Sequence, residues 1–342
     1  MLASSSDALS RIHDLGMFDL DGVVYIGGKA VAGAAEHLEA VRGDGMRCAF
    51  ITNNAARQPG RVAQHLRELG VSARESDVVT SAQAAARVLR ERIGVGAAVV
   101  VLGGEGLHAA VLAEQLVAVD VEEDAEAIVT GYGPDVRWSA VMRAAVRIRD
   151  GLWWVASNTD GSIPTAFGVA PGHGVLVETL QRFAGVDPVV AGKPERPLLD
   201  ETIRRVGGER PLMIGDRLDT DIQGARRVGI DSLLVLTGVT GLDELVAARP
   251  EERPTYLGPD LGTLRERHRA PERRDHGWAL GGWVAQVASE RLQCRGEGAP
   301  ADWWRCVAAA AWTHLDDEGD VADVSDLEVP TPPRASSGGP GR

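Results

Sequence analysis

Residues 17–24 read Met-Phe-Asp-Leu-Asp-Gly-Val-Val, and this stretch decides the fold. The segment 15–24 is short and apolar and is closed by a glycine turn, which is typical of a buried strand that runs into an active-site loop. Asp19 and Asp21 can both face one cavity there, while Leu20 points into the core. Two carboxylates this close repel, so they need a cation or a retained proton. The alternative is an Asp-rich turn that caps a helix.

The composition indicates a globular chain long enough for two domains. Its 342 residues are 44% hydrophobic and 25% charged, and the net charge is −13. That charge disfavours nucleic acid and anionic membranes as partners, although a metal can still hold an anionic substrate locally. The three cysteines have no metal-ligand spacing, and no stretch resembles a signal peptide or a spanning helix. We therefore expect a cytoplasmic protein that binds no nucleic acid and does not insert into membranes.

Short apolar runs alternate with helical patterns between residues 16 and 236, which favours an α/β fold with a doubly wound, Rossmann-like parallel sheet. Such sheets bind ligands outside the carboxyl ends of their strands. Polar clusters follow predicted strands at four places: Asp19-Leu-Asp21-Gly22, Thr52-Asn53-Asn54, Gly192-Lys193-Pro194 and Gly215-Asp216, the last with Asp221 downstream. Each cluster alone has an ordinary explanation, such as a helix cap, a solvated lysine or a turn.

Together, in this order, the clusters resemble the four motifs of the haloacid dehalogenase-type phosphatases. About 140 residues with their own α/β pattern separate Thr52 from Lys193, which is similar to the subfamily that carries a large α/β cap at this point. That subfamily includes NagD-like, 4-nitrophenyl phosphate, phosphoglycolate and glycerol-3-phosphate phosphatases. The resemblance spans residues 14–260 and is strongest to the actinobacterial glycerol-3-phosphate phosphatases. It rests on the stretches FDLDGVVYIGG, ITNNAARQP, VLGGEGL, SNTD, GKP and GDRLDTDI.

The resemblance implies a catalytic core formed by residues 1–81 and 189–261, with a substrate-selecting cap over residues 82–188. It also implies a Mg²⁺-dependent phosphoric monoester hydrolase. Asp19 would be the nucleophile that forms an aspartyl-phosphate, and Asp21 would be the general acid and later the base.

The same resemblance implies the groups that bind the metal and the phosphate. Mg²⁺ would be held by Asp19, by Asp216 and by the main-chain carbonyl of Asp21. The phosphoryl oxygens would be bound by Thr52, the Asn53 amide and Lys193, with Asn54 as a further substrate-binding candidate. Asp221 would orient Lys193 or the metal-bound waters.

Candidate substrate contacts in the cap are Asn158, Asp160 and His173. Turn chemistry is the alternative for the first two, and a loop or helix-capping histidine is the alternative for the third.

No aromatic box for a nucleobase or a pyridoxal ring is evident, so we expect a small phosphorylated metabolite, with glycerol 3-phosphate as the best candidate. Phosphoglycolate, a sugar phosphate and 4-nitrophenyl phosphate are the alternatives, and so is a phosphotransferase that uses the same intermediate. Four intact motifs disfavour a binding protein with an inert core.

The C-terminal part lies outside the resemblance. Residues 262–315 are expected to form a helical segment with helices over 277–292 and 302–315, followed by an acidic, disordered tail over 316–342. Gln293–Gly298 also matches the Q-x-x-G-x-G loop of acetyltransferases, although the segment is too short for such an enzyme. This part holds five of the eight tryptophans: Trp278, Trp283, Trp303, Trp304 and Trp312. We expect them to pack on the core or to form the contact of a homodimer.

Overall fold

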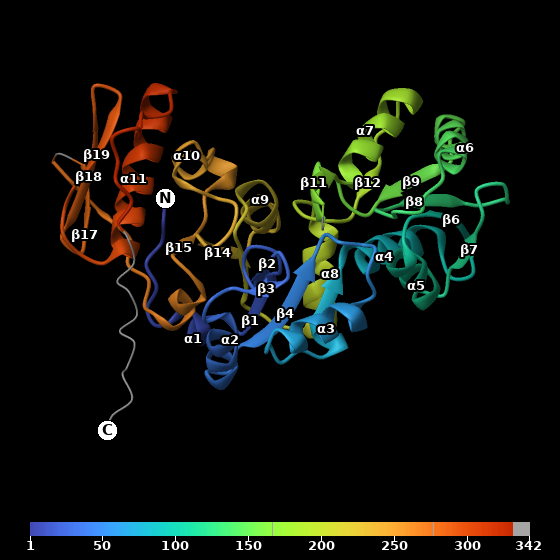
Figure 1. Cartoon of the computed structure of the whole chain (residues 1–342), viewed down its shortest axis with the longest axis horizontal. Helices are drawn as coiled ribbons and strands as arrows, with labels where there is room; N and C mark the ends of the chain where they lie inside the picture. The colour runs from blue at the N-terminus through green and yellow to red at the C-terminus, as the bar shows by residue number, and fades with distance from the viewer. Residues whose placement is uncertain (166, 276, 331–342) are drawn as a thin grey trace.

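The computed structural model describes residues 1–165, 167–275 and 277–330. A central parallel sheet, a second parallel sheet and a C-terminal antiparallel sheet lie side by side along the longest axis of the molecule (Figure 1). The first two confirm the expected α/β class with parallel sheets.

The central sheet has the strand order β15-β14-β13-β1-β4-β5, and all its pairs are parallel. Its strands are β1 (Leu15–Asp19), β4 (Arg47–Thr52), β5 (Val78–Thr80), β13 (Pro211–Gly215), β14 (Asp231–Val235) and β15 (Tyr256–Gly258). Strand β1 pairs with β13 along one edge and with β4 along the other, and its two faces pack in different clusters of buried residues. Burial of both faces explains why residues 15–18 are apolar and do not alternate with polar residues.

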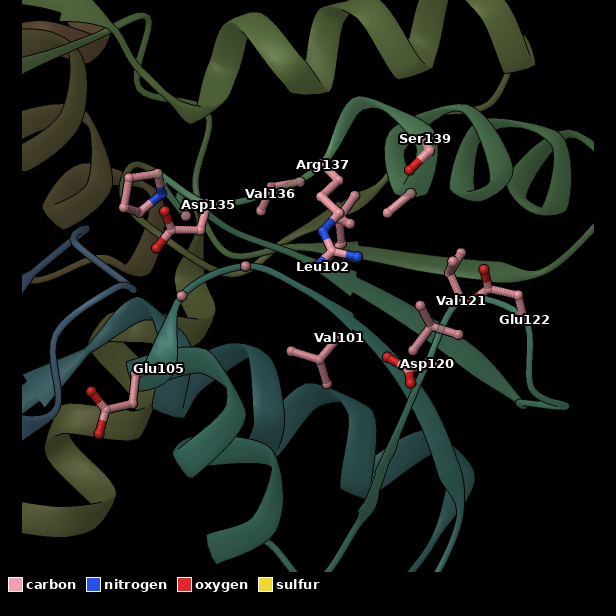
Figure 2. A pocket seen from close by; sticks show the side chains of 16 residues that line it. Val101, Leu102, Glu105, Asp120, Val121, Glu122, Asp135, Val136, Arg137 and Ser139 are labelled. Atoms are coloured by element: carbon pink, nitrogen blue, oxygen red, sulfur yellow. The ribbon is translucent and has the colours of Figure 1, made fainter.

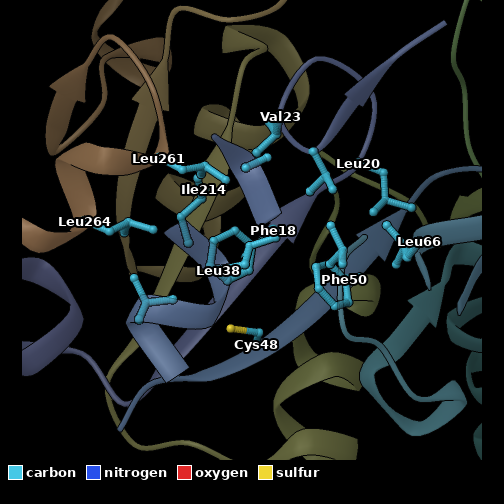
Figure 3. Packing of buried hydrophobic residues seen from close by; sticks show 14 of the residues in the cluster. Phe18, Leu20, Val23, Leu38, Cys48, Phe50, Leu66, Ile214, Leu261 and Leu264 are labelled. Carbon is cyan, nitrogen blue, oxygen red and sulfur yellow. The ribbon is translucent and has the colours of Figure 1, made fainter. Parts of the chain in front are cut away.

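Alternate residues of β1 point to opposite faces of the sheet and enter different cores. Phe18 packs with Phe50 and Ile214 on one face, together with Leu38 from a flanking helix (Figure 3). Met17 belongs to the cluster on the other face. Packing on both faces holds the strand rigidly and thereby fixes the residue at its carboxyl end.

Helices and short turns connect and cover the central strands. They are α1 (Leu9–Ile12), α2 (Ala34–Gly43), α3 (Pro59–Glu68), α4 (Ser81–Ile93), α8 (Arg196–Val206), α9 (Gln223–Val228) and α10 (Leu242–Val246), with the short helical turns η1 (Glu75–Asp77), η2 (Leu218–Ile222), η3 (Pro250–Glu252) and η4 (Leu261–Arg265). A small hairpin, β2 (Tyr25–Ile26) and β3 (Lys29–Ala30), follows the first motif. Helix α4 begins with a capping box in which Thr80 Oγ1 accepts from the Gln83 amide and Gln83 Oε1 accepts from the Thr80 amide.

The second sheet is formed by residues between 98 and 190 and has the order β12-β9-β8-β6-β7. Its elements are β6 (Ala98–Leu102), α5 (Glu105–Ala113), β7 (Val117–Val119), β8 (Ala127–Thr130), α6 (Trp138–Arg149), β9 (Trp153–Ala156), α7 (His173–Ala184) and β12 (Val189–Val190), with a hairpin of β10 (Ser162–Thr165) and β11 (Gly168–Pro171). The carboxyl ends of β9 and β12 lead into residues 157–161 and 191–193. These two loops carry candidate site residues to the central sheet.

The C-terminal unit contains an antiparallel sheet where the sequence predicted a helix. The expected helix over 277–292 is wrong, because these residues form strands of an antiparallel sheet. The strands are β16 (Glu272–Arg274), β17 (Gly277–Leu280), β18 (Trp283–Ala288) and β19 (Arg291–Gly296). Gly281 and Gly282, both at positive φ, form the two-residue turn between β17 and β18, a hairpin signal that outweighs the helical spacing. The expected helix over 302–315 is confirmed as α11 (Pro300–Glu318).

Helix α11 packs between this sheet and the central sheet. Trp303 and Trp312 are buried within the chain, and Trp312 Nε1 donates to the Leu245 carbonyl at 2.7 Å. Arg305, also buried, donates to the carbonyl of Leu257 in β15 at 2.9 Å. The tryptophans therefore pack on the core, one of the two expected roles. In the part of the chain that the structure describes, no helix combines the length and apolar character needed to cross a bilayer.

The expected disordered tail is wrong for residues 316–327. The first three continue α11, and Ala322, Val324 and Leu327 belong to the apolar cluster under the C-terminal sheet. Leu292 in β19 donates to the Asp323 carbonyl at 2.9 Å, which attaches this segment to the sheet. Apolar residues spaced between the acidic ones provide the buried contacts. The end of the expected tail, 331–342, lies outside the described residues.

The acetyltransferase-like loop Gln293–Gly298 has a structural explanation. A Cβ on Gly296 would lie 2.0 Å from the Gly282 carbonyl oxygen, and one on Gly298 would lie 2.1 Å from the Gly281 carbonyl oxygen. The glycines are thus required because two backbones approach closely, and the space that a pyrophosphate would need is filled by the β17–β18 turn.

Candidate active site

Three candidate residues lie at the carboxyl ends of adjacent strands of the central sheet. Asp19 ends β1, Thr52 ends the neighbouring β4, and Asp216 directly follows β13 on the other side. Parallel strands bring their carboxyl ends to one edge, so residues far apart in sequence meet there.

Lys193 reaches this edge from the loop after β12. Its side chain is only 3% exposed, and its ammonium Nζ lies 2.5 Å from Asp19 Oδ1 and 2.7 Å from Asp221 Oδ1. Asp221 sits in the short helical turn η2, and a Cβ on Gly215 would lie 2.3 Å from its carboxylate. The expected link between Asp221 and Lys193 is therefore a direct ion pair.

Asp19, Asp216 and Asp221 form a carboxylate cluster in which one oxygen of each lies within 4.8 Å of the others. Asp216 is held by the loop after β14, where the Val239 amide donates to its Oδ2 at 2.7 Å and the Thr240 hydroxyl donates to its carbonyl. Its other carboxylate oxygen, Oδ1, is buried without a hydrogen-bond partner among the described residues.

The charges of this cluster are not balanced. Burial raises the pKa of Asp19 well above its usual range, and the neighbouring carboxylates add to that rise while Lys193 opposes it. Burial, reinforced by Asp221, likewise raises the pKa of Asp216 to about 6. Desolvation disfavours the Lys193 ammonium, but the attraction of Asp19 and Asp221 outweighs it and raises the pKa of Lys193. One ammonium faces three carboxylates, which leaves a site for further positive charge.

The residues present fit a hard divalent cation. Carboxylate oxygens are the ligands that Mg²⁺ prefers, and the unpartnered Asp216 Oδ1 is a buried acceptor in need of a cation or a donor. Asp21 was also expected to contribute, through its main-chain carbonyl; its carboxylate lies outside the three-residue cluster, and that contribution stays a prediction. The site is therefore a candidate Mg²⁺ centre built mainly on Asp19 and Asp216, with Asp221 beside them.

Asp21 lies on the turn after β1, with its side chain exposed to solvent. Desolvation by the surrounding protein nevertheless raises the pKa of its carboxyl group, against the opposing charges of Arg57 and Lys193. A raised pKa at the mouth of the site suits a group that must hold a proton and then release it.

The residues after β4 divide into two roles. Thr52 is buried, and its hydroxyl oxygen accepts from the Asn54 amide at 3.0 Å, which leaves its O–H group able to donate. Asn54 Oδ1 accepts from the Ala56 amide in a local turn. The Asn53 side chain contacts the main chain of Lys193, so it is committed to protein groups and not to a ligand.

The candidate substrate contacts from the second-sheet unit lie in two different places. Asn158 and Asp160 lie beside the central sheet: Asn158 Nδ2 donates to the Asn53 carbonyl at 2.7 Å, and Asp160 Oδ1 accepts from Asn53 Nδ2 at 2.9 Å. His173 instead lies in the interior of the second-sheet unit, 3% exposed, with Nε2 3.2 Å from Thr130 Oγ1. Burial lowers the pKa of His173 to about 4. These contacts favour the structural alternative for this histidine.

The loop after β14 is the part of the site that sequence reasoning missed. It holds Asp216 through Val239 and Thr240, and a Cβ on Gly238 would lie 2.0 Å from Asp216 Oδ2. Gly22 has φ +88°, and a Cβ there would lie 2.3 Å from the same oxygen. The signal was present, because Thr-Gly-Val-Thr-Gly directly follows a predicted strand that ends at the same edge as the others.

A separate cavity of about 460 Å³ lies at the carboxyl ends of β6 and β8 in the second sheet. Figure 2 shows Arg137 and Asp120 facing this hollow. Its lining includes four carboxylates and a single guanidinium, and none of the candidate catalytic residues. Because no candidate catalytic residue lines this cavity, the carboxylate–lysine site remains the candidate active site.

Comparison with known proteins identifies the family. Residues 16–117 match the family described as haloacid dehalogenase-like hydrolase, and residues 190–264 match the HAD-hydrolase-like family. The chain is 41% identical over 316 residues to D-glycerol 3-phosphate phosphatase of Mycobacterium tuberculosis, an alignment that covers 89% of this chain and 87% of that protein. This chain is a haloacid dehalogenase-like hydrolase.

Two further relatives support the assignment. This haloacid dehalogenase-like hydrolase is 34% identical over 250 residues to the acid sugar phosphatase of Staphylococcus saprophyticus, which covers 72% of this chain and 95% of that protein. The crystal structure of a glycerol phosphate phosphatase from Mycobacterium tuberculosis in complex with magnesium superposes with a TM-score of 0.82 at 39% identity, over 90% of this chain and 92% of that chain. The alignments with the D-glycerol 3-phosphate phosphatase sequence and with the magnesium complex are longer than the two parallel-sheet units together. The similarity to these two relatives therefore extends into the C-terminal unit.

Proposed function

We propose that this hydrolase is a Mg²⁺-dependent phosphomonoesterase and that its substrate is glycerol 3-phosphate. The observation that carries the proposal is the pairing of Asp19 with Lys193 inside the carboxylate cluster, at the edge where a phosphoryl group would arrive. The relative of highest identity quoted above is a glycerol 3-phosphate phosphatase, and the alignment includes the segment that would form the cap.

In the proposed reaction, two aspartates carry the covalent and proton-transfer steps, and Thr52 and Lys193 bind the phosphoryl group. The Asp19 carboxylate attacks phosphorus, the P–O bond to the leaving alcohol breaks, and an aspartyl-phosphate forms. Asp21 gives its proton to the leaving alkoxide and then takes one from the water that hydrolyses the intermediate. Thr52 donates a hydrogen bond to the phosphoryl oxygens and Lys193 contributes positive charge beside them. Asp19 and Asp216 would hold Mg²⁺, which would supply charge neutralisation for the phosphoryl group.

We also propose that residues 1–81 and 189–261 act as the catalytic core and residues 82–188 as a cap over it. Support comes from the loop after β9, which contacts the residues after β4 through Asn158 and Asp160. A cap in this position excludes water from the reacting groups and restricts the alcohol part of the ester.

Phosphate release from a panel of esters tests the function. The panel is glycerol 3-phosphate, phosphoglycolate, a sugar phosphate and 4-nitrophenyl phosphate, each with Mg²⁺ and with EDTA. We expect glycerol 3-phosphate to have the highest kcat/KM, and we expect Asp19→Asn to reduce release at least ~10³-fold. Asp200→Asn, at an exposed helical carboxylate paired with Arg196, is the matched control. Full activity of Asp19→Asn would refute the mechanism, and faster phosphate transfer to glycerol than to water would identify a phosphotransferase.

We further propose that the enzyme works in the cytoplasm as a homodimer. The described cysteines are all free thiols, as a reducing compartment requires. The side chains of Trp138, Met142 and Val146, one helical turn apart on α6, are exposed together as an apolar stripe. Light scattering on the purified protein tests the dimer, and Met142→Glu should convert it to monomers.

A further inference from the structure

The side-chain amide of Asn53 joins two parts of the molecule that are distant in sequence. Its Oδ1 accepts from the main-chain amide of Lys193 at 2.8 Å, while its Nδ2 donates to the Lys193 carbonyl at 3.0 Å and to Asp160 Oδ1 at 2.9 Å. Asn53 is 8% exposed. Both N–H bonds and the carbonyl oxygen of this amide are thus used within the protein.

These contacts hold the backbone of Lys193 from both its N–H and its C=O. A lysine ammonium sits on a flexible four-carbon stem, so its position depends on where the backbone starts. Here Nζ must reach Asp19 Oδ1 and Asp221 Oδ1 at 2.5 and 2.7 Å together. The planar Asn53 amide is the group that fixes the starting point.

The backbone of Asn53 is itself held by two other segments. Its carbonyl oxygen accepts from Ser81 Oγ at 2.6 Å, at the start of α4, and from Asn158 Nδ2 at 2.7 Å, in the loop after β9. Gly192 completes the contact, because a Cβ there would lie 2.6 Å from Asn53 Oδ1. Ser81 and Gly192 mark the two places where the chain enters and leaves the inserted segment.

We propose that Asn53 is a positioning residue that places the Lys193 ammonium on Asp19, and that Asp160 holds Asn53 in that orientation. Seating of the 157–161 loop against the central sheet is thereby transmitted to the ammonium. This inference deepens the proposed phosphatase function and rests on it for its kinetic test. It also gives the side chains of Asn53 and Asp160 a role that acts through Lys193 and not by contact with the ester.

A competing explanation makes a different kinetic prediction. If Asp160 bound the hydroxyl groups of the substrate, its removal would raise KM for glycerol 3-phosphate and leave turnover of 4-nitrophenyl phosphate unchanged. If it acts through Lys193, removal lowers kcat for both esters by the same factor, because Lys193 serves the phosphoryl group that they share.

The first experiment compares Asn53→Ala, Asp160→Ala, Asp160→Asn and the double alanine variant on both esters. We expect kcat to fall about 100-fold for Asn53→Ala and about 10-fold for Asp160→Ala, with KM nearly constant. Asp160→Asn keeps an oxygen acceptor for Asn53 Nδ2 and should recover most of the activity. The double variant should be no slower than Asn53→Ala, because Asp160 acts through Asn53. Asp187→Asn, at an exposed carboxylate that accepts from Gln181 Nε2 at 2.9 Å, is the matched control.

The second experiment does not depend on activity. The chain contains only two lysines, the exposed Lys29 and the buried Lys193, so amine acylation followed by peptide mass analysis reports on both. In the wild type Lys193 should react far more slowly than Lys29. In Asn53→Ala its rate should rise about tenfold relative to Lys29, whereas Asp187→Asn should leave the ratio unchanged.

The outcomes separate the two claims. A wild-type enzyme that releases no phosphate from any ester would overturn the proposed function, and the acylation ratio would still decide the inference. An active wild type with an additive double variant, an ester-specific loss, or unchanged Lys193 protection in a folded Asn53→Ala protein would overturn the inference alone. Circular dichroism and the melting temperature establish that each variant is folded.

Discussion

The ammonium of Lys193 partly neutralises a cluster of three carboxylates, so its removal should be measurable as lost stability before any substrate is added. In Lys193→Met the stem is kept and the charge is removed. Nζ lies 2.5 Å from Asp19 Oδ1 and 2.7 Å from Asp221 Oδ1, and the lysine side chain is 3% exposed. The variant leaves three neighbouring carboxylates with no ammonium among them.

The magnitude follows from those distances. At an effective dielectric constant of about 20, each pair attracts by about 6 kcal/mol, and the desolvation of the buried ammonium offsets several kcal/mol of the sum. Breaking a buried ion pair by removing one partner costs about 3–5 kcal/mol, and we expect that loss in the free energy of unfolding. Mg²⁺ should restore part of it, because a cation that binds only the folded protein stabilises it and neutralises the same carboxylates.

Urea unfolding in EDTA and in saturating Mg²⁺ measures both effects. Arg196→Met is the control, since Arg196 and Asp200 form a pair whose side chains are 59% and 51% exposed and its loss should cost less than about 1 kcal/mol. If Lys193→Met and Arg196→Met lost the same stability in EDTA, or if Mg²⁺ stabilised Lys193→Met no more than the wild type, the charge-balance argument would be wrong.

Three further predictions test other parts of the structure. Gly22→Ala should weaken Mg²⁺ binding in calorimetric titration, because its Cβ would lie 2.3 Å from Asp216 Oδ2 and Gly22 has φ +88°; equal affinity would contradict this. Burial lowers the pKa of His173 from 6.5 to about 4, so the unfolded chain takes up a proton that the folded chain does not. Stability should be complete above about pH 6.5 and decline toward pH 4, and urea unfolding of His173→Leu should decline less over that range. Trp312→Ala should lower the free energy of unfolding by about 3–5 kcal/mol, because Trp312 is fully buried and donates to the Leu245 carbonyl; a loss below 1 kcal/mol would contradict the packing.

Much of the candidate site could be predicted from local sequence patterns. Asp19, Thr52 and Asp216 each follow an apolar run that is buried on both sides of a parallel sheet. The carboxyl ends of such strands meet at one edge, so recognising the strands was sufficient to bring these residues together. Lys193 was recognised by its motif and lies in contact with Asp19, while its expected role at the phosphoryl oxygens stays a prediction.

Local patterns gave the wrong secondary structure where the spacing of apolar residues fits both a helix and a pair of strands. Trp278 and Trp283 fit a helical pattern, yet Gly281 and Gly282 adopt positive φ and form the turn of a hairpin. Residues 277–288 therefore form two paired strands and not a helix, and the sheet packs against α11. The Gly-Gly turn is visible in the sequence, but the packing against α11 that favours the strands is a tertiary contact.

The sequence by itself determined which residues are the candidates for the chemistry, because their order, their types and their positions after apolar strands are local properties. Only the tertiary structure decided how those residues are held. Asn53 meets Asp160 from 107 residues away and Lys193 from 140 residues away. An amide has two donors and an acceptor that can serve protein or ligand equally well, and its own sequence neighbours do not indicate which. Its partners are chosen by the folding of the second-sheet unit against the central sheet. The Asn53 side chain therefore holds the lysine, while the expected donation from the Asn53 amide to a phosphoryl oxygen stays a prediction.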